Sequence, residues 1–297
     1  MSADYPTMPL QPAHTAELYA RFLARGRALR LSPNTLDWYR YVLGPFVATV
    51  TGRATPAEIA AYIATAPSAE SARNWLRAIR ALYAWHERQT GEPSPARSVE
   101  PPRQRRVLPR VFSDGELRLI LASAERDPLN YAAVAVLLDT GMRIGELASL
   151  TVEALEAGGA LVSGKTGQRR VPLTPAALQA LMRIAPLGGP IFTWRHGRRG
   201  LGARPMAVRT LTHRVRAVIA EAGVSGRKVG PHTFRHTFAT LYLRGGGDIY
   251  RLQRILGHSS IHQTMAYLHL SDPEAFAEHA KLSPLVHALR NSRSASA

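Results

Sequence analysis

Residues 231–240 read Pro-His-Thr-Phe-Arg-His-Thr-Phe-Ala-Thr and place two histidines and an arginine within one short stretch. Three further segments bring together residues of the same kinds with glycines and a tyrosine. They are Thr140-Gly-Met-Arg-Ile-Gly-Glu-Leu147, Gly164-Lys-Thr-Gly167 and Leu256-Gly-His-Ser-Ser-Ile-His-Gln-Thr-Met-Ala-Tyr267. Each segment is weak evidence by itself, because an isolated arginine or histidine is usually a surface or core residue. Their order and spacing along one chain make the combination specific.

The sequence around these segments predicts helices interrupted by two short strands. Ser113 and Glu116 form a capping-box pattern that starts the first helix of this half. Apolar residues on either side of the glycine-bounded turn at 164–168 predict a pair of strands. The predicted helices cover 114–126, 128–140, 143–150 and 206–222, and the predicted strands cover 159–163 and 169–173.

The first part of the chain is predicted to be helical. Ser32-Pro33 and Thr55-Pro56 each read as an N-cap followed by proline at the first helical position. On the last of these helices, Arg73, Arg77 and Arg80 recur at spacings of four and three and therefore share a face. We interpret that face as a DNA contact, with a solvated polar face as the alternative. The predicted helices cover 14–29, 33–49, 56–64 and 69–89.

Residues 93–110, Pro-Ser-Pro-Ala-Arg-Ser-Val-Glu-Pro-Pro-Arg-Gln-Arg-Arg-Val-Leu-Pro-Arg, separate the two halves. The prolines exclude a continuous helix, and the stretch has little to bury, so an extended basic linker is expected. The sequence predicts a helical domain over 1–97, a linker over 98–111 and a second, α+β domain over 112–297. The expected fold class is mainly α with a small β-sheet.

The formal net charge of +17 arises from 38 basic against 21 acidic residues. Such an excess indicates a polyanionic partner, with nucleic acid as the leading candidate and a merely basic protein as the alternative. The chain has no cysteine, which excludes disulfides and thiolate metal sites. No signal peptide is visible, and no apolar run approaches the roughly 18 residues of a membrane span. A soluble, cytoplasmic protein without a membrane anchor is therefore expected.

Taken together, the four segments resemble the tyrosine recombinase family, also called the phage integrase family. The hallmark of that family is an arginine in a TGxRxxEL segment, a lysine on a β-hairpin, an HxxR pair, and an LGH segment followed nine residues later by a tyrosine. The matching residues here are Arg143, Lys165, His232, Arg235, His258 and Tyr267. The resemblance spans nearly all of residues 112–270. It implies the family's two-domain DNA clamp, in which the helical first domain binds the core site.

The resemblance implies that Tyr267 attacks a backbone phosphorus to form a 3′-phosphotyrosyl bond and a free 5′-hydroxyl. A phenol with an unperturbed pKa of roughly 10 needs a base, and His232 is the expected one. Lys165 is the expected general acid for the departing 5′-oxygen, because arginine does not readily release a proton. Lysine is rare in this chain, which otherwise has it only at positions 228 and 281. An exposed turn residue is the alternative interpretation of Lys165.

The other members of the set are expected to bind the phosphate. Arg143 and Arg235 would hold its non-bridging oxygens, and His258 would add a hydrogen bond. Glu146 would orient the basic residues. The phosphotyrosyl ester keeps the energy of the broken phosphodiester, so the resemblance implies neither ATP nor any other cofactor.

Two histidine pairs, His232/His236 and His258/His262, have the spacing of metal ligands on a helix. Neither pair has the glutamate of an HExxH motif, and no clustered carboxylate completes a site. A metal is therefore not expected, and His236 is interpreted as a packing or supporting residue.

The expected partner is a double-stranded DNA recombination site, bound by a homotetramer or by a heterotetramer with a paralogue. A predicted helix from Asp272 to about Lys281 resembles the family's C-terminal segment, which docks into a neighbouring protomer. A helix folded back on its own domain is the alternative. The residues expected to contact DNA are Arg73, Arg77, Arg80, Arg103, Arg105, Arg106, Arg209 and Arg216.

The chain looks like a minimal Xer-type recombinase, which resolves chromosome dimers during chromosome partition and cell division. An integrase or transposase of a mobile element is the alternative within the family. A topoisomerase of the same chemistry fits less well, because of the N-terminal helical domain and the tail suited to assembly. A catalytically inactive, architectural DNA-binding protein is the alternative from another class, and the complete residue set argues against it.

Overall fold

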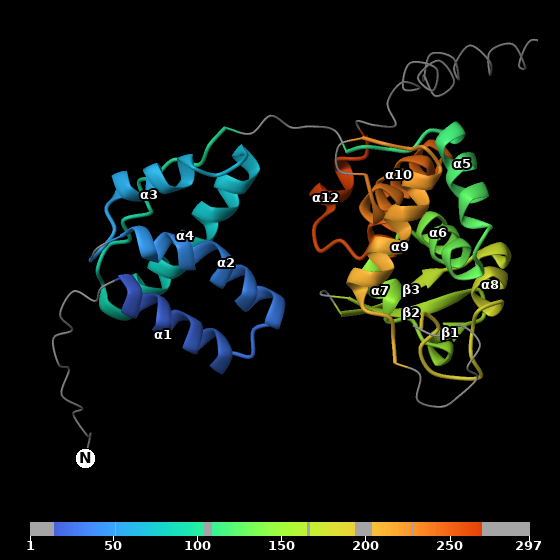
Figure 1. Ribbon diagram of the computed structural model, residues 1–297, viewed down its shortest axis with the longest axis horizontal. Helices are drawn as coiled ribbons and strands as arrows, with labels where there is room; N and C mark the ends of the chain where they lie inside the picture. Colours follow the sequence, from blue (N-terminus) through green and yellow to red (C-terminus); the bar gives the residue numbers. More distant parts are fainter. Residues whose placement is uncertain are drawn as a thin grey trace, which may run out of the picture. The chain divides into compact units, whose positions relative to one another are not determined.

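The computed structural model of the chain describes residues 15–50, 52–103, 109–164, 167–193, 204–226 and 229–268. The chain divides into two compact units, Met1–Val107 and Leu108–Ala297 (Figure 1). Several predicted features lie outside the described residues: Arg105, Arg106, Lys165 and the helix 272–281. Within the described ranges, no helix is long and apolar enough to cross a membrane.

The described part of the first unit consists of helices, and a side chain caps the start of each of the last three. They are α1 Thr15–Ala28, α2 Pro33–Thr49, α3 Pro56–Ala64 and α4 Ala69–Thr90 (Figure 1). Ser32 and Thr55 each cap the helix that follows by accepting a hydrogen bond from a backbone N–H, and a proline comes directly after each cap. The helix starts expected from the sequence are therefore confirmed.

The core of the first unit takes in part of the stretch that was expected to bury little. Ala96 and Val99 are both buried in this core, against the apolar face of α4. Arg80 on α4 donates hydrogen bonds to their carbonyl oxygens, at 3.2 and 2.6 Å. The expectation was wrong because an arginine on α4 satisfies the carbonyls of the extended chain, which lets its isolated apolar side chains reach the core.

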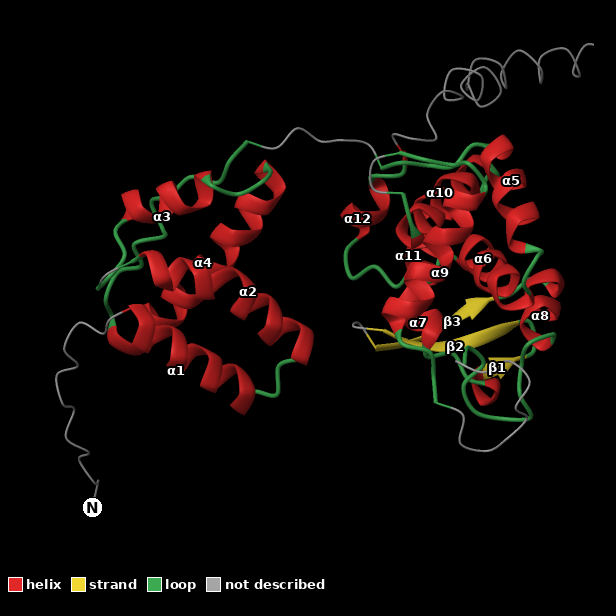
Figure 2. Ribbon diagram, viewed as in Figure 1, coloured by secondary structure: helices red, strands yellow, loops and turns green. Residues whose placement is uncertain are grey.

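The described part of the second unit combines helices with a three-stranded antiparallel sheet (Figure 2). The strands are β1 Leu155–Glu156, β2 Gly159–Gly164 and β3 Gly167–Pro172, in the order β1-β2-β3. The helices are α5 Asp114–Ala124, α6 Pro128–Thr140, α7 Ile144–Ala148, η1 (3-10) Val152–Ala154, α8 Pro175–Met182, α9 Val208–Glu221, α10 Pro231–Arg244, α11 Ile249–Leu256 and α12 Ile261–Met265. The predicted fold class, mainly α with a small sheet, is confirmed.

The hairpin β2–β3 matches the two strands predicted from the sequence. Its register pairs Gly159 with Pro172 at one end and Gly164 with Gly167 at the other. The edge strand β1 was not predicted, because a strand of two residues offers no alternation to recognise. The last residue of β2, Gly164, lies against Glu146 of α7.

The end of α6 brings three helices of the second unit together. Gly141 stops α6 in the left-handed conformation, with φ of 60°. A Cβ at this position would collide with the ring of Phe238 on α10 and lie 2.9 Å from Leu256 on α11. Glycine therefore permits the close approach of α6, α10 and α11 just before Arg143.

We predict that Gly141→Ala destabilises the protein through both its backbone conformation and this collision. The left-handed conformation costs roughly 1–2 kcal/mol for a residue with a Cβ, and overpacking adds about 1–3 kcal/mol. Gly158→Ala is the matched control, because Gly158 also has a positive φ, of 74°, but has open space around it. Urea denaturation should show a clearly larger loss for Gly141→Ala. Equal losses would contradict the role of close packing.

Candidate active site

The turn between α6 and α7 fixes the backbone of Arg143. The hydroxyl of Thr140 donates to the carbonyl of Val136 and accepts from the N–H of Met142, at 2.6 and 3.2 Å. Arg143 is then the N-cap residue of α7. Its own N–H donates to Oε2 of Glu146 at 2.8 Å, so the first turn of α7 holds it in place.

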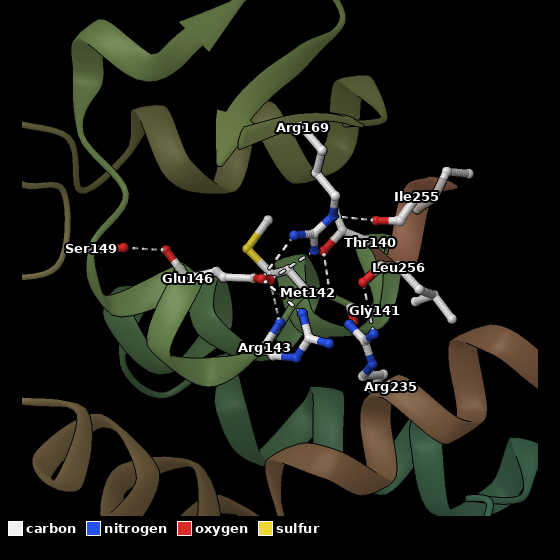
Figure 3. A network of polar contacts seen from close by, with 10 residues as sticks. All are labelled: Thr140, Gly141, Met142, Arg143, Glu146, Ser149, Arg169, Arg235, Ile255 and Leu256. Atoms are coloured by element: carbon white, nitrogen blue, oxygen red, sulfur yellow. Dashed lines mark hydrogen bonds and ion pairs between the residues drawn. The ribbon is translucent and has the colours of Figure 1, made fainter. Parts of the chain in front are cut away.

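Glu146 is a buried carboxylate surrounded by arginines, with 4% of its side chain exposed. Its Oε1 accepts from Nη1 of Arg143 at 3.1 Å and from Nη1 of Arg169 at 2.8 Å. Its Oε2 also accepts from Nη2 of Arg169 at 2.8 Å, so the pair with Arg169 is bidentate (Figure 3). Burial tends to raise the pKa of Glu146, but hydrogen bonds from Arg169 and Arg143 outweigh burial and lower it. The carboxylate is therefore ionised at neutral pH.

Arg235 on α10 is buried, and main-chain carbonyls fix its guanidinium. Nη1 donates to the carbonyl of Gly141 at 2.9 Å, and Nη2 donates to the carbonyl of Leu256 at 2.7 Å (Figure 3). Burial, together with the positive charge of Arg143, lowers the pKa of Arg235 to about 10, which leaves it protonated at neutral pH. Arg235 thereby ties α10 to the residues just before Arg143 and just before His258.

Tyr267 follows α12 and is buried, with 4% of its surface exposed. Its hydroxyl lies 2.9 Å from Nδ1 of His236. The ring of His258 lies parallel to the Tyr267 ring, with 6.4 Å between centroids, and Nδ1 of His258 is 2.9 Å from the hydroxyl of Thr264. Burial raises the pKa of Tyr267, although Arg235 and Arg143 oppose this effect.

The histidine beside the phenol is not the one that the sequence suggested as its base. His236, interpreted from the sequence as a packing or supporting residue, makes the hydrogen bond to Tyr267. His232 is exposed, four residues earlier on α10. The spacing of the two histidines places them on one face of the helix, which was a signal for this neighbourhood.

All three histidines of this region have lowered pKa values. Desolvation by the surrounding protein is the largest cause for each of them, although the surface of His232 still reaches solvent, and the charge of Arg235 contributes to each. The pKa falls to about 4 for His236 and for His258. Both rings are therefore neutral at neutral pH and have a nitrogen able to accept a proton.

Arg169 on β3 is the residue of this cluster that sequence reasoning missed. No periodicity or motif distinguishes it from Arg170, the next residue. Its partners Glu146 and Ile255 are distant in the sequence, so local pattern gave no signal. Within the described parts of the chain, no group of three or more metal-binding side chains is found.

The arginines predicted to contact DNA differ in what else they contact. Arg73, Arg103, Arg209 and Arg216 are exposed. Arg77 is exposed too and lies over the ring of Trp38, 5.0 Å from its centroid. Arg73 donates a hydrogen bond to the carbonyl of Pro102 at 3.0 Å, and Arg80 donates to the carbonyls of Ala96 and Val99. These contacts leave the prediction of DNA binding untested.

Comparisons with known proteins show the family of this chain. The phage integrase family matches residues 110–274. The tyrosine recombinase XerC of Xylella fastidiosa (strain 9a5c) is 31% identical over 263 residues, which are 81% of this chain and 87% of that protein. The tyrosine recombinase XerD of Yersinia pestis is 29% identical over 266 residues, 81% of this chain and 88% of that protein.

Solved structures show the same fold. The crystal structure of XerA recombinase is 27% identical, with a TM-score of 0.50, and the match covers 91% of this chain and 99% of that one. The Tn1549 transposon integrase in complex with a circular intermediate DNA is 20% identical, with a TM-score of 0.74, over 91% of this chain and 99% of that one. The chain therefore belongs to the phage integrase family, the tyrosine recombinases, and is similar to its Xer members.

Proposed function

We propose that this protein is a site-specific recombinase that cleaves and rejoins DNA through a 3′-phosphotyrosyl bond to Tyr267. The observation that carries the proposal is the convergence of distant segments on one place. Arg235 donates hydrogen bonds to the carbonyl oxygens of Gly141 and Leu256. Gly141 lies two residues before Arg143, and Leu256 lies two residues before His258. Tyr267 lies against His258 and bonds to His236, the residue after Arg235.

Arg143 and Arg235 supply the charge for a phosphate. Both are cationic, and both act on Tyr267 by lowering its pKa against the effect of burial. Arg143 shares the buried carboxylate of Glu146 with Arg169, and Arg235 bonds to main-chain carbonyls, so the cluster keeps a net positive charge for a phosphodiester to neutralise. In the transition state, negative charge grows on the non-bridging oxygens, where fixed donors are most effective.

Tyr267→Phe tests the nucleophile. The variant should bind DNA as the wild type does, because only a hydroxyl is lost, yet it should form no covalent complex with a nicked suicide substrate. Denaturing electrophoresis measures the protein–DNA adduct. Tyr242→Phe is the matched control and should form adduct normally. An adduct formed by Tyr267→Phe would exclude Tyr267 as the nucleophile.

His232 is proposed as the base that removes the phenol proton during attack. The phenol is buried against His236, whereas a DNA phosphate arrives from solvent. Tyr267 must therefore leave His236 to reach it. His232 is exposed one turn earlier on the same face of α10, and its lowered pKa keeps it neutral and able to accept a proton.

We predict that His232→Ala slows adduct formation by about 10²–10⁴-fold, the usual contribution of a general base. His236→Ala should have a smaller effect, because it loses a holding hydrogen bond rather than the proton acceptor. Single-turnover rates of adduct formation, at saturating protein, compare the two variants. A large loss in His236→Ala with a near-normal rate in His232→Ala would assign the base to His236.

Lys165 is proposed as the general acid for the 5′-oxygen. Gly164, the residue before it, lies against Glu146, so the hairpin leads from the arginine cluster to Lys165.

Lys165→Arg keeps the charge but not the transferable proton, and we predict that it cleaves ordinary DNA far more slowly than the wild type. A 5′-bridging phosphorothiolate, whose sulfur leaves without protonation, should restore its rate. Cleavage of ordinary DNA at the normal rate would exclude the general-acid role.

The proposed biological role is chromosome dimer resolution by a tetramer on a DNA recombination site. The support is the match to XerC and XerD over most of this chain. Among structures of the same fold, lambda integrase is described as a tetramer bound to a Holliday junction, and XerH as bound to its difH substrate.

Mapping the cleavage sites of this protein on its own genome tests the role. A single site near the replication terminus is expected, and cleavage at the ends of a mobile element would favour integration instead.

A further inference from the structure

Arg169 connects three segments of the active site through one guanidinium. It lies on β3 with only 11% of its side chain exposed. Two of its nitrogens bond to the two oxygens of Glu146 on α7, and its Nε donates to the carbonyl of Ile255 on α11, at 2.7 Å. Figure 3 shows the guanidinium between these two partners. The hairpin, α7 and the end of α11 are therefore joined at this residue.

Glycines make the space for this group. A Cβ at Gly257, which has φ of 64°, would lie 2.9–3.1 Å from three side-chain atoms of Arg169. A Cβ at Gly164 would lie 2.6 Å from Oε1 of Glu146 and 3.4 Å from Nη1 of Arg169. The backbone on both sides is thus shaped around the Arg169–Glu146 pair.

The way in which Glu146 is shared determines how Arg143 is held. Arg169 makes two bonds of 2.8 Å with the carboxylate, whereas the Arg143 side chain makes one longer bond, of 3.1 Å, and remains 32% exposed. A buried carboxylate is costly unless it is paired. Without Arg169, Glu146 would draw the Arg143 guanidinium into a full ion pair and away from solvent.

We propose that Arg169 is a positioning residue, which saturates Glu146 and thereby leaves the Arg143 guanidinium available to bind the DNA phosphate. The proposal rests on the function proposed above. Through the carbonyl of Ile255, Arg169 also fixes the chain next to Leu256, whose carbonyl holds Arg235. Arg169 itself does not touch the phosphate in this scheme.

The test compares Arg169→Met with Arg170→Met. Arg170 is the next residue on β3, is 80% exposed and pairs with Glu156 at 2.9 Å, outside the site. With a nicked suicide duplex that carries the mapped cleavage site, Arg169→Met should form adduct at least about 10-fold more slowly, as expected for a displaced binding group. The fraction of protein that finally forms adduct and the Kd for DNA should change by less than about 2-fold. Arg170→Met should match the wild type.

A double variant separates positioning from a general structural role. In Arg169→Met with Glu146→Gln, the buried charge that captures Arg143 is gone, so the adduct rate should recover most of the loss. A residue that only stabilises the fold predicts instead that both variants change the fraction of protein that forms adduct and not the rate of the reactive fraction, because neutralising an unpaired buried carboxylate also restores stability. That result, or a wild-type rate in Arg169→Met, would overturn the proposal.

Two further measurements complete the test. If Arg169→Met does not fold, Arg169→Lys replaces it, because one ammonium preserves the charge but not the bidentate bond; the same slow rate and the same recovery with Glu146→Gln are expected. The 5′-bridging phosphorothiolate should not restore the rate of Arg169→Met. Restoration would place the defect at the leaving group and overturn the proposal. Failure of the wild type to form adduct would instead contradict the proposed function.

Discussion

The ionised, buried side chain of Glu146 is the constraint on which the catalytic unit depends. An unpaired carboxylate at this depth would cost several kcal/mol, so the arginines that pair with it must be in place when the unit folds. One of these arginines comes from the turn after α6 and the other from β3. The same arginine of β3 holds a carbonyl of α11. The pairs that satisfy Glu146 therefore also join the hairpin, α7 and α11 in the folded unit.

The cluster is left with more positive than negative charge. Arg143, Arg169 and Arg235 surround a single carboxylate, and Arg235 is buried with main-chain carbonyls as its partners. Burial and this excess of positive charge lower the pKa values of His232, His236 and His258. The same positive charge disfavours protonation of these histidines. In the proposed function, a phosphodiester brings the missing negative charge and relieves the repulsion among these arginines.

Local sequence signals were sufficient for the helices and insufficient for the contacts between them. Ser32 and Thr55 correctly predicted where their helices start, because an N-cap contacts a backbone N–H only three residues away. The burial of Ala96 and Val99 depended on Arg80, and the role of Arg169 depended on Glu146 and Ile255, all distant in sequence. The proposed catalytic set rests on the resemblance to a family, whereas the bond between His236 and Tyr267 could be found only from the fold.

In the proposed mechanism, the position of Tyr267 has an energetic consequence for the reaction. Its ring is buried beside Leu252 and Leu256, and its hydroxyl is bonded to His236. Exposing an aromatic ring costs roughly 1.5–3 kcal/mol, and breaking a neutral hydrogen bond costs about 1 kcal/mol. Specific DNA sites commonly bind about 4–10 kcal/mol more tightly than non-specific DNA. In the proposed mechanism, the release of Tyr267 therefore lies within the extra free energy that a specific site supplies over non-specific DNA, which would couple exposure of the proposed nucleophile to recognition of the site.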